Sequence, residues 1–349
     1  MTRVAGHPIW IEARRGDAVE SLHEVRWARH AAAAESGDTS LGTFLRSAAK
    51  PFQLLPFLLT PESAGCDAAD LAVMAGSHDG TDAHASRVAA ILQRLGASES
   101  DLRCGVHRPY FLEALPAQSA ERLRRYGPLH NNCSGNHAAM LGLATAYGVD
   151  PRAYLDPTSR SQQVMHAVVE AFCGARPVLA VDSCGAPCYF LPLARMAEGY
   201  TRLSHPSGLA SLPPERRRAL TALADLDTVV AAVDRIAIAM AQQPEWVTGE
   251  RSGYTCVVRA LGGDVVLKHG AEGVLCVAHR TRGEGIALKV MDGNERALVP
   301  ALLHLVAPEG WLDASARGAL ADWFEPRLHG RLDQVVGSLR VATTRVHTG

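Results

Sequence analysis

The sequence lacks a strong charge bias, a long apolar run and a Cys-x-x-Cys pair, and each absence excludes a class of protein. Its 349 residues carry a formal net charge of −1, so nothing indicates a nucleic-acid partner or a membrane-surface partner. No apolar run approaches the roughly 20 residues that a transmembrane helix needs. The absence of a Cys-x-x-Cys pair argues against a zinc ribbon.

The beginning of the sequence contains no apolar core of a signal peptide. We therefore expect a cytoplasmic protein, in which the eight cysteines serve as thiols, ligands or core residues rather than as disulfides. A hydrophobic fraction of 47% and a charged fraction of 20% are typical of a globular chain that buries a sizeable core.

A Ser-x-x-Lys motif at Ser47 and Lys50 precedes an apolar run. Residues three apart lie on one face of a helix, so Lys50 would sit one turn from Ser47. Pro51 is typical of a first helical turn, which places Ser47 where backbone N–H groups can face a developing oxyanion. A lysine activates a serine when burial or nearby positive charge keeps the amine partly neutral. The alternative is a solvated surface, because the motif is common by chance.

A cluster of small and polar residues over 75–84 precedes a predicted helix. It contains Ser77 and His78, and two glycines that let the backbone approach another group closely. Its alternative interpretation is an ordinary loop with a helix N-cap.

A second cluster, over 130–137, also leads into a predicted helix. Cys133, Asn136 and His137 fall at positions i, i+3 and i+4 near the start of that helix, so they would share one face. The alternative is a helix cap beside a buried cysteine.

A buried strand is predicted over 176–181, and it ends at Asp182, Ser183 and Cys184. Polar groups at the end of a strand are typical of functional sites in α/β proteins, although a lone cysteine there is more often a core residue. Because the 130–137 cluster offers another thiol, a shared metal site is conceivable.

Segments rich in β-branched residues, separated by glycine turns, predict antiparallel strands over 265–290, and residues 8–23 predict a hairpin. Lys268 would lie at the end of one strand, beside His269 and Gly270. Taken alone, Lys268 is typical of an edge-strand lysine that blocks pairing between sheets.

The order of these motifs resembles that of the serine β-lactamases and penicillin-binding proteins, although no clear Ser-x-Asn is present and a histidine follows the late lysine. The sequence more closely resembles the thermolabile, rhizobial-type L-asparaginases (the asparaginase II family), which share the β-lactamase-like fold. The segments that carry this resemblance are Arg46-Ser47-Ala48-Ala49-Lys50-Pro51-Phe52-Gln53, Gly76-Ser77-His78, Asn131-Asn132-Cys133-Ser134-Gly135, Val181-Asp182-Ser183-Cys184-Gly185 and Lys268-His269-Gly270-Ala271-Glu272-Gly273.

The resemblance implies an α+β or α/β fold like that of the serine β-lactamases, with an antiparallel sheet flanked by helices plus a mostly helical region. We expect one asparaginase II-like domain over residues 1–349, in which a helical region at about 50–250 is inserted between the N- and C-terminal portions of the sheet. The family is homodimeric, so the resemblance also implies a homodimer.

The implied reaction is hydrolysis of the side-chain amide of L-asparagine to L-aspartate and ammonia. Ser47 would be the nucleophile with Lys50 as its base, and Ser77 and Lys268 would form a second pair that relays protons or helps to activate the first. Two lysines close together would lower each other's proton affinity, as a lysine base requires. The supporting residues that the resemblance implies are His78, Asp182, Cys256 and Gly270.

The family also carries a zinc site near the serines. Its ligands map to Cys133 and Cys184, with a lysine at the position of Asn136. Asparagine is neutral and a poor zinc ligand, so water or His137 would have to complete the shell. Zinc is therefore a candidate cofactor, and no organic cofactor is expected.

Two other functions stay open. The residues that shape the substrate pocket cannot be identified from the sequence, so an amidohydrolase of the same fold would be able to use glutamine or a peptide-like amide. The second alternative is a non-catalytic protein that binds a ligand or a metal. The presence of both serines and both lysines argues against it, because binding alone has no chemical need for four such groups.

Overall fold

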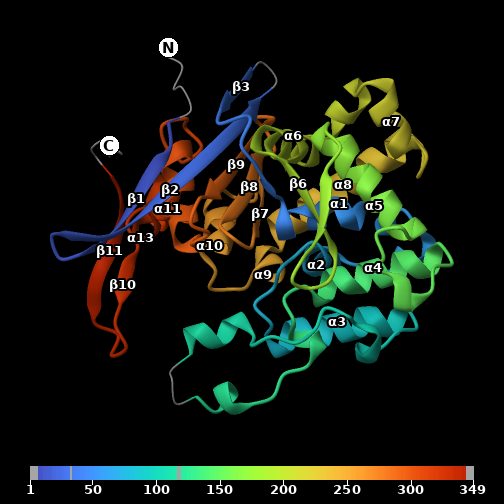
Figure 1. Ribbon diagram of the computed structural model, residues 1–349, viewed down its shortest axis with the longest axis horizontal. Coiled ribbons are helices and arrows are strands. Elements are labelled where there is room, and N and C mark those ends of the chain that lie inside the picture. The colour runs from blue at the N-terminus through green and yellow to red at the C-terminus, as the bar shows by residue number, and fades with distance from the viewer. Residues whose placement is uncertain (1–6, 32–33, 116–118, 343–349) are drawn as a thin grey trace.

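The computed structural model describes residues 7–31, 34–115 and 119–342, and it contains two antiparallel sheets surrounded by helices (Figure 1). The strands of the larger sheet are β1 (Ile9–Arg15), β2 (Ala18–Ala31), β3 (Ala34–Gly37), β7 (Val265–Gly270), β8 (Val274–His279), β9 (Glu284–Val290), β10 (Arg327–His329) and β11 (Val335–Val341). The smaller sheet consists of β4 (Gly42–Phe44), β5 (Val178–Val181) and β6 (Pro187–Pro192).

The larger sheet has the strand order β10-β11-β1-β2-β9-β8-β7, with β3 paired to β2, and the smaller sheet has the order β4-β6-β5. The large sheet thus combines strands from both ends of the chain. The helices between them are α1 (Lys50–Leu58), α2 (Ala68–Met74), α3 (Asp82–Arg94), α4 (Ser134–Ala146), α5 (Arg160–Cys173), α6 (Leu193–Ser204), α7 (Pro214–Thr221), α8 (Leu226–Gln242), α9 (Pro244–Val247) and α10 (Gly253–Ala260). The C-terminal helices are α11 (Leu298–Val306), α12 (Ala314–Ala319) and α13 (Ala321–Phe324).

Helices cover both faces of the larger sheet, as alternation along β8 illustrates. Cys276 and Ala278 point into the core shared with α1–α8, whereas Leu275 and Val277 point into the core shared with α10 and α11. Figure 1 shows the helices between α1 and α8 grouped to one side of the larger sheet. The predicted architecture, an antiparallel sheet flanked by helices plus a mostly helical region, is confirmed. Within the described ranges, no helix combines the length and the apolar character needed to cross a membrane.

Two sequence interpretations are corrected. Lys268 lies on β7, at one end of the strand order, but its side chain is fully buried because helices cover that edge, so it is not a solvent-facing edge lysine. The segment 176–181 was predicted to be a buried strand, yet Val178 and Val181 in β5 are 66% and 77% exposed. The reason is that β5 pairs only with β6 and forms an outer strand of the small sheet.

A buried carboxylate joins the helices behind the small sheet. Glu198 in α6 is 3% exposed and forms ion pairs with Arg195, Arg202 and Arg216, the last at 3.0 Å. Arg216 belongs to α7 and also donates hydrogen bonds to the Ala171 carbonyl at the end of α5. The carboxylate therefore links α6 to α7, and its partner Arg216 links both helices to α5.

Replacing Glu198 with glutamine should destabilise the protein by about 3 kcal/mol, because the arginines would lose the charge that offsets their repulsion. Urea unfolding at neutral pH measures this change in the free energy of unfolding. The control is Glu309→Gln, which removes a half-exposed partner of Arg29 and should cost under about 1 kcal/mol. Equal effects of both substitutions would contradict the role assigned to Glu198.

Candidate active site

The hydroxyl of Ser77 lies between two lysine side chains. Its Oγ is 2.8 Å from Lys50 Nζ and 2.9 Å from Lys268 Nζ. All three residues are at most 3% exposed. Each comes from a different part of the chain: Lys50 starts α1, Ser77 follows α2, and Lys268 lies on β7. Tertiary folding therefore builds one Lys–Ser–Lys cluster from two sequence motifs and a loop.

Lys50 Nζ has three hydrogen-bond acceptors. They are the Gly76 carbonyl at 2.8 Å, Ser77 Oγ at 2.8 Å and Cys133 Sγ at 3.2 Å. These acceptors match the three protons of an ammonium group. Every proton of a Lys50 ammonium therefore has an acceptor in this arrangement.

Lys268 has the opposite character. Burial, together with the charge of Lys50, holds the pKa of Lys268 well below its ordinary value. Lys268 donates a hydrogen bond to the His269 carbonyl at 2.6 Å. A neutral amine also has a lone pair, which can accept the Ser77 proton while Ser77 Oγ accepts from Lys50. The two lysines can therefore share one proton, which passes between them by way of the Ser77 hydroxyl.

Ser77 is fixed by close backbone packing. Its N–H donates to the Val247 carbonyl at 2.7 Å. A Cβ at the preceding Gly76 would lie 2.7 Å from that same carbonyl oxygen, so only glycine allows this approach.

Ser47 lies in a short 3₁₀ helix, η1 (Arg46–Ala49), and is partly exposed. Its carbonyl accepts the backbone N–H of Lys50, so the two residues are one turn apart. Among the described residues the Ser47 hydroxyl has no hydrogen-bond partner, and the Lys50 side chain points to Ser77 instead. The serine that leads the motif is therefore the more accessible one, and Ser77 is the one that both lysines contact.

Arg46 sets the direction of the Ser47 turn. Its φ of 49° is left-handed, a strained conformation for a residue with a side chain. A bidentate ion pair holds it: Nε and Nη2 lie 2.8 and 3.1 Å from the two Asp182 carboxylate oxygens. Burial alone would raise the pKa of Asp182, but the hydrogen bonds and the charge of Arg46, together with the Ser183 N–H, outweigh burial and hold that pKa below its usual range. Asp182 thus affects the Ser47 turn through its ion pair with Arg46.

Gly270 brings β7 directly against the Ser47 turn. A Cβ at this position would lie 2.9 Å from the Leu45 carbonyl and 3.2 Å from the Ser47 nitrogen. The lysine-bearing strand and the serine-bearing turn are in contact only because residue 270 has no side chain.

The other two expected supporting residues have different surroundings. His78 is fully buried, accepts the Gly80 N–H at Nδ1 (3.2 Å) and donates from Nε2 to Ser134 Oγ (3.0 Å), so it fixes the Ser77 loop to α4. Burial holds the pKa of His78 well below its ordinary value, consistent with a neutral ring. Cys256 lies in α10 and packs against the core near α11; in the described part of the chain it has no hydrogen bond to the lysines or to Ser77.

Cys133 and Cys184 are in contact, but the residues around them do not complete a metal-binding site. The thiol of Cys184 hydrogen-bonds Cys133, lowering the pKa of Cys133, with help from Lys50, and raising that of Cys184. Within the described ranges no group of three or more His, Cys, Asp or Glu side chains is arranged to hold a metal ion.

The two candidates for a third ligand both present protons. Asn136 Nδ2 is buried and has no hydrogen-bond partner among the described residues, and an amide nitrogen donates hydrogen bonds rather than binding a cation. His137 Nδ1 lies 2.6 Å from the Tyr154 hydroxyl, which itself accepts the Arg103 N–H, so Nδ1 takes the hydroxyl proton and the unpartnered Nε2 carries hydrogen. These residues do not fit a zinc ion in this arrangement.

Sequence reasoning found the serines and lysines but assigned no role to Arg46, whose left-handed backbone leaves no sequence signal. Spacing along a helix placed Lys50 one turn from Ser47. It did not indicate that the Lys50 side chain forms a hydrogen bond with Ser77, which comes from another part of the chain.

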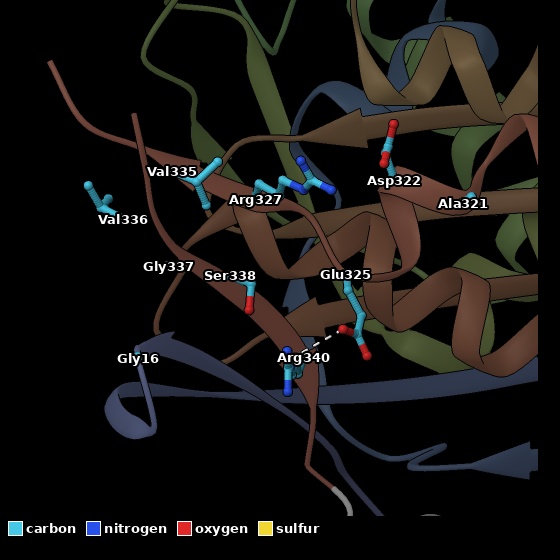
Figure 2. Close-up of a pocket in the computed structure, with 10 residues that line it drawn as sticks. All are labelled: Gly16, Ala321, Asp322, Glu325, Arg327, Val335, Val336, Gly337, Ser338 and Arg340. Carbon is cyan, nitrogen blue, oxygen red and sulfur yellow. Dashed lines mark ion pairs between the residues drawn. The ribbon is translucent and has the colours of Figure 1, made fainter. Parts of the chain in front are cut away.

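A cavity of about 600 Å³ lies elsewhere, between α13 and the C-terminal hairpin (Figure 2). Figure 2 shows the ion pair between Glu325 and Arg340, 3.2 Å long, on its wall. Its lining contains no lysine, histidine or cysteine and none of the predicted site residues. The Lys–Ser–Lys cluster is therefore the stronger candidate for a catalytic site.

Fold and site together describe a mixed α/β protein with a buried cluster of one serine and two lysines beside a second, accessible serine. Residues 11–341 match the sequence profile described as L-asparaginase II. The chain belongs to the L-asparaginase II family. A comparison with curated proteins finds no match.

Several solved structures are similar to this chain. Mglu in its native form in the presence of 4.3 M NaCl shares 15% identity at a TM-score of 0.44, covering 82% of this chain and 60% of that one. Another crystal structure of Mglu shares 15% identity at a TM-score of 0.43, covering 88% and 68%. A putative β-lactamase from Bacteroides dorei DSM 17855 shares 13% identity at a TM-score of 0.32, covering 86% and 93%. The chain thus spans less than two thirds of the first of these structures.

Replacing Gly270 with alanine should lower kcat by about 10-fold or more, because the added methyl forces β7 away from the Ser47 turn. Steady-state kinetics on an amide substrate measures the effect. The control is Gly318→Ala in α12, where nothing lies within 4 Å of the added Cβ and activity should be unchanged. Wild-type kcat in the Gly270 variant would contradict the close approach.

Replacing Lys268 with methionine should abolish activity yet raise the free energy of unfolding by about 1 kcal/mol or more at pH 7. Because the folded-state pKa of Lys268 is lowered, the unfolded chain binds a proton that the folded chain lacks. This group therefore makes the wild type less stable as pH falls from about 10, and the variant should show a flatter stability–pH curve. Urea unfolding between pH 6 and pH 10 measures both changes. Lys289→Met is the comparison: burial also lowers the pKa of the half-buried Lys289, but less than that of Lys268, so this variant should flatten the curve less. An unchanged slope would show that Lys268 stays charged in the folded protein.

Proposed function

We propose that this protein is an L-asparaginase that hydrolyses the side-chain amide of L-asparagine to L-aspartate and ammonia through serine and lysine chemistry. Membership of the L-asparaginase II family supports this activity in general terms. The observation that carries the mechanism is the position of Ser77 Oγ, within 2.9 Å of two buried lysine nitrogens. Amide hydrolysis needs a group that first takes and then returns a proton, and this cluster holds one movable proton.

In the proposed mechanism, Ser77 relays a proton between the lysines. Lys50 gives a proton to Ser77 Oγ while Ser77 gives its own proton to the lone pair of Lys268. Lys50 becomes a neutral amine and Lys268 an ammonium, and no net charge moves into or out of the cluster. Lys50 is then the base for Ser47, one turn before it, as a lysine base must be neutral to act.

Ser47 is the proposed nucleophile because it is the accessible serine, whereas Ser77 is 2% exposed. Its Oγ forms a bond to the amide carbon while Lys50 takes the hydroxyl proton. The carbon–nitrogen bond then breaks, and Lys50 returns the proton to the leaving ammonia. Water attacks the resulting ester with Lys50 again as base, which releases L-aspartate and restores the Ser47 hydroxyl.

The two serines should respond differently to substitution. Ser47→Ala should lower kcat by about 10⁴-fold, since the nucleophile is removed. Ser77→Ala should lower kcat by about 10²- to 10³-fold and change its pH dependence, since Lys50 would lose its proton path. Ammonia release from L-asparagine, with L-glutamine measured in parallel, gives the rates.

Acid-quenched mass spectrometry identifies the nucleophile. An aspartyl ester should be found on the peptide that contains Ser47, in the wild type and in the slower Ser77 variant. An ester on Ser77 would reverse the assignment of the serines. Hydrolysis of glutamine without hydrolysis of asparagine would contradict the proposed substrate but would be compatible with the proposed serine and lysine mechanism. Unaltered ligand binding with no turnover of either amide would favour a binding protein.

A further inference from the structure

Two cysteines from distant segments, Cys133 and Cys184, have thiols that form a hydrogen bond with each other. Cys133 is the N-cap of α4 and is 6% exposed, whereas Cys184 lies in the turn between β5 and β6 and is partly exposed. Both are free cysteines, and neither thiol takes part in the proposed reaction steps. The two candidates for a third zinc ligand, Asn136 and His137, present protons rather than lone pairs. The contact between these thiols therefore needs another explanation.

The surroundings of this thiol pair favour oxidation. Lys50 Nζ donates a hydrogen bond to Cys133 Sγ at 3.2 Å, and a cation beside the sulfur is typical of cysteines that react with peroxides. The Cys184 thiol already touches Cys133, so it is placed to resolve a sulfenic acid there. Disulfide formation brings the two sulfurs to about 2 Å. The surface turn that contains Cys184 and the exposed Ser183 can supply this movement.

We propose that a small peroxide oxidises Cys133 and Cys184 to a reversible disulfide, which lowers the activity of the enzyme. The Cys133 sulfur attacks one peroxide oxygen, the O–O bond breaks, and the other oxygen leaves as water with the thiol proton. The Cys184 sulfur then attacks the Cys133 sulfur, the S–O bond breaks, and a second water leaves with the Cys184 proton. Two thiols thus lose two electrons to one peroxide. Because Cys133 is only 6% exposed, hydrogen peroxide suits this step better than a bulky disulfide.

The effect of the disulfide on activity rests on the proposed serine and lysine mechanism. Cys133 Sγ is one of the three acceptors around Lys50 Nζ. A sulfur in a disulfide carries no charge and accepts hydrogen bonds weakly, so oxidation leaves one proton of the buried Lys50 poorly satisfied. Lys50 is then held less firmly against Ser77, and catalysis is sensitive to small displacements of a reacting group. We expect kcat on L-asparagine to fall by about 10-fold or more.

Thiol counting and mass spectrometry test the disulfide independently of activity. After treatment with hydrogen peroxide, alkylation of the unfolded protein should show that two of the eight thiols are lost. The intact mass should be about 2 Da lower, and peptide mapping should join Cys133 to Cys184. Dithiothreitol should restore both thiols and, in parallel, kcat. Cys184→Ser should instead gain about 16 Da or more, because the sulfenic acid on Cys133 has no thiol to resolve it.

Cys66→Ser is the matched control. Cys66 is partly exposed like Cys184, and its thiol forms a hydrogen bond with the cation of Arg94. This variant should form the disulfide and lose activity to the same extent as the wild type. Equimolar zinc should not protect the wild-type thiols from peroxide, because Asn136 and His137 do not complete a metal site.

Three results would overturn the proposal. They are eight intact thiols after peroxide treatment, a Cys133–Cys184 disulfide that leaves kcat unchanged, and protection of the pair by equimolar zinc. A disulfide that joins other cysteines would also contradict it. A reduced wild type that forms the expected disulfide but hydrolyses no L-asparagine would contradict the proposed function alone, since the thiol count and the mass do not depend on that activity.

Discussion

The structure of the site depends on two lysine side chains buried around one hydroxyl. Burying an amine costs free energy unless its protons find acceptors, and two of them together repel when both are charged. The fold supplies the two lysines with different numbers of hydrogen-bond acceptors. Lys50 receives a carbonyl, a hydroxyl and a thiol, while Lys268 receives a carbonyl and the shared hydroxyl. That inequality makes one lysine the holder of the proton and the other its acceptor.

Close backbone packing keeps this arrangement in place. Glycines at 76 and 270 let the Ser77 loop and β7 approach neighbouring main chains more closely than any Cβ would allow. The Arg46–Asp182 ion pair holds a left-handed residue immediately before Ser47. Strain, absent side chains and a bidentate ion pair thus act together to place two serines and two lysines with little freedom.

The thiol pair near Lys50 contributes charge whether or not a metal is bound. Cys133 accepts a hydrogen bond from Lys50, and its pKa is lowered by Cys184 and by that lysine. The neighbouring amide and imidazole present protons toward their surroundings, which suits acceptors rather than cations. Cys133, which is in contact with Cys184, therefore serves in this structure as a hydrogen-bond partner for Lys50.

The sequence by itself singled out two serines and two lysines as candidates for the chemistry, because Ser-x-x-Lys, Gly-Ser-His and Lys-His-Gly are local patterns. It also predicted the strands and helices whose periodicity is strong. Tertiary structure decided the partners. Lys50 turns to Ser77 rather than Ser47, and Arg46 to Asp182, because these contacts join segments far apart in the chain. It also decided that Val178–Val181 is exposed and Lys268 buried. Composition reports how apolar a strand is, but only the neighbouring elements determine whether anything covers it.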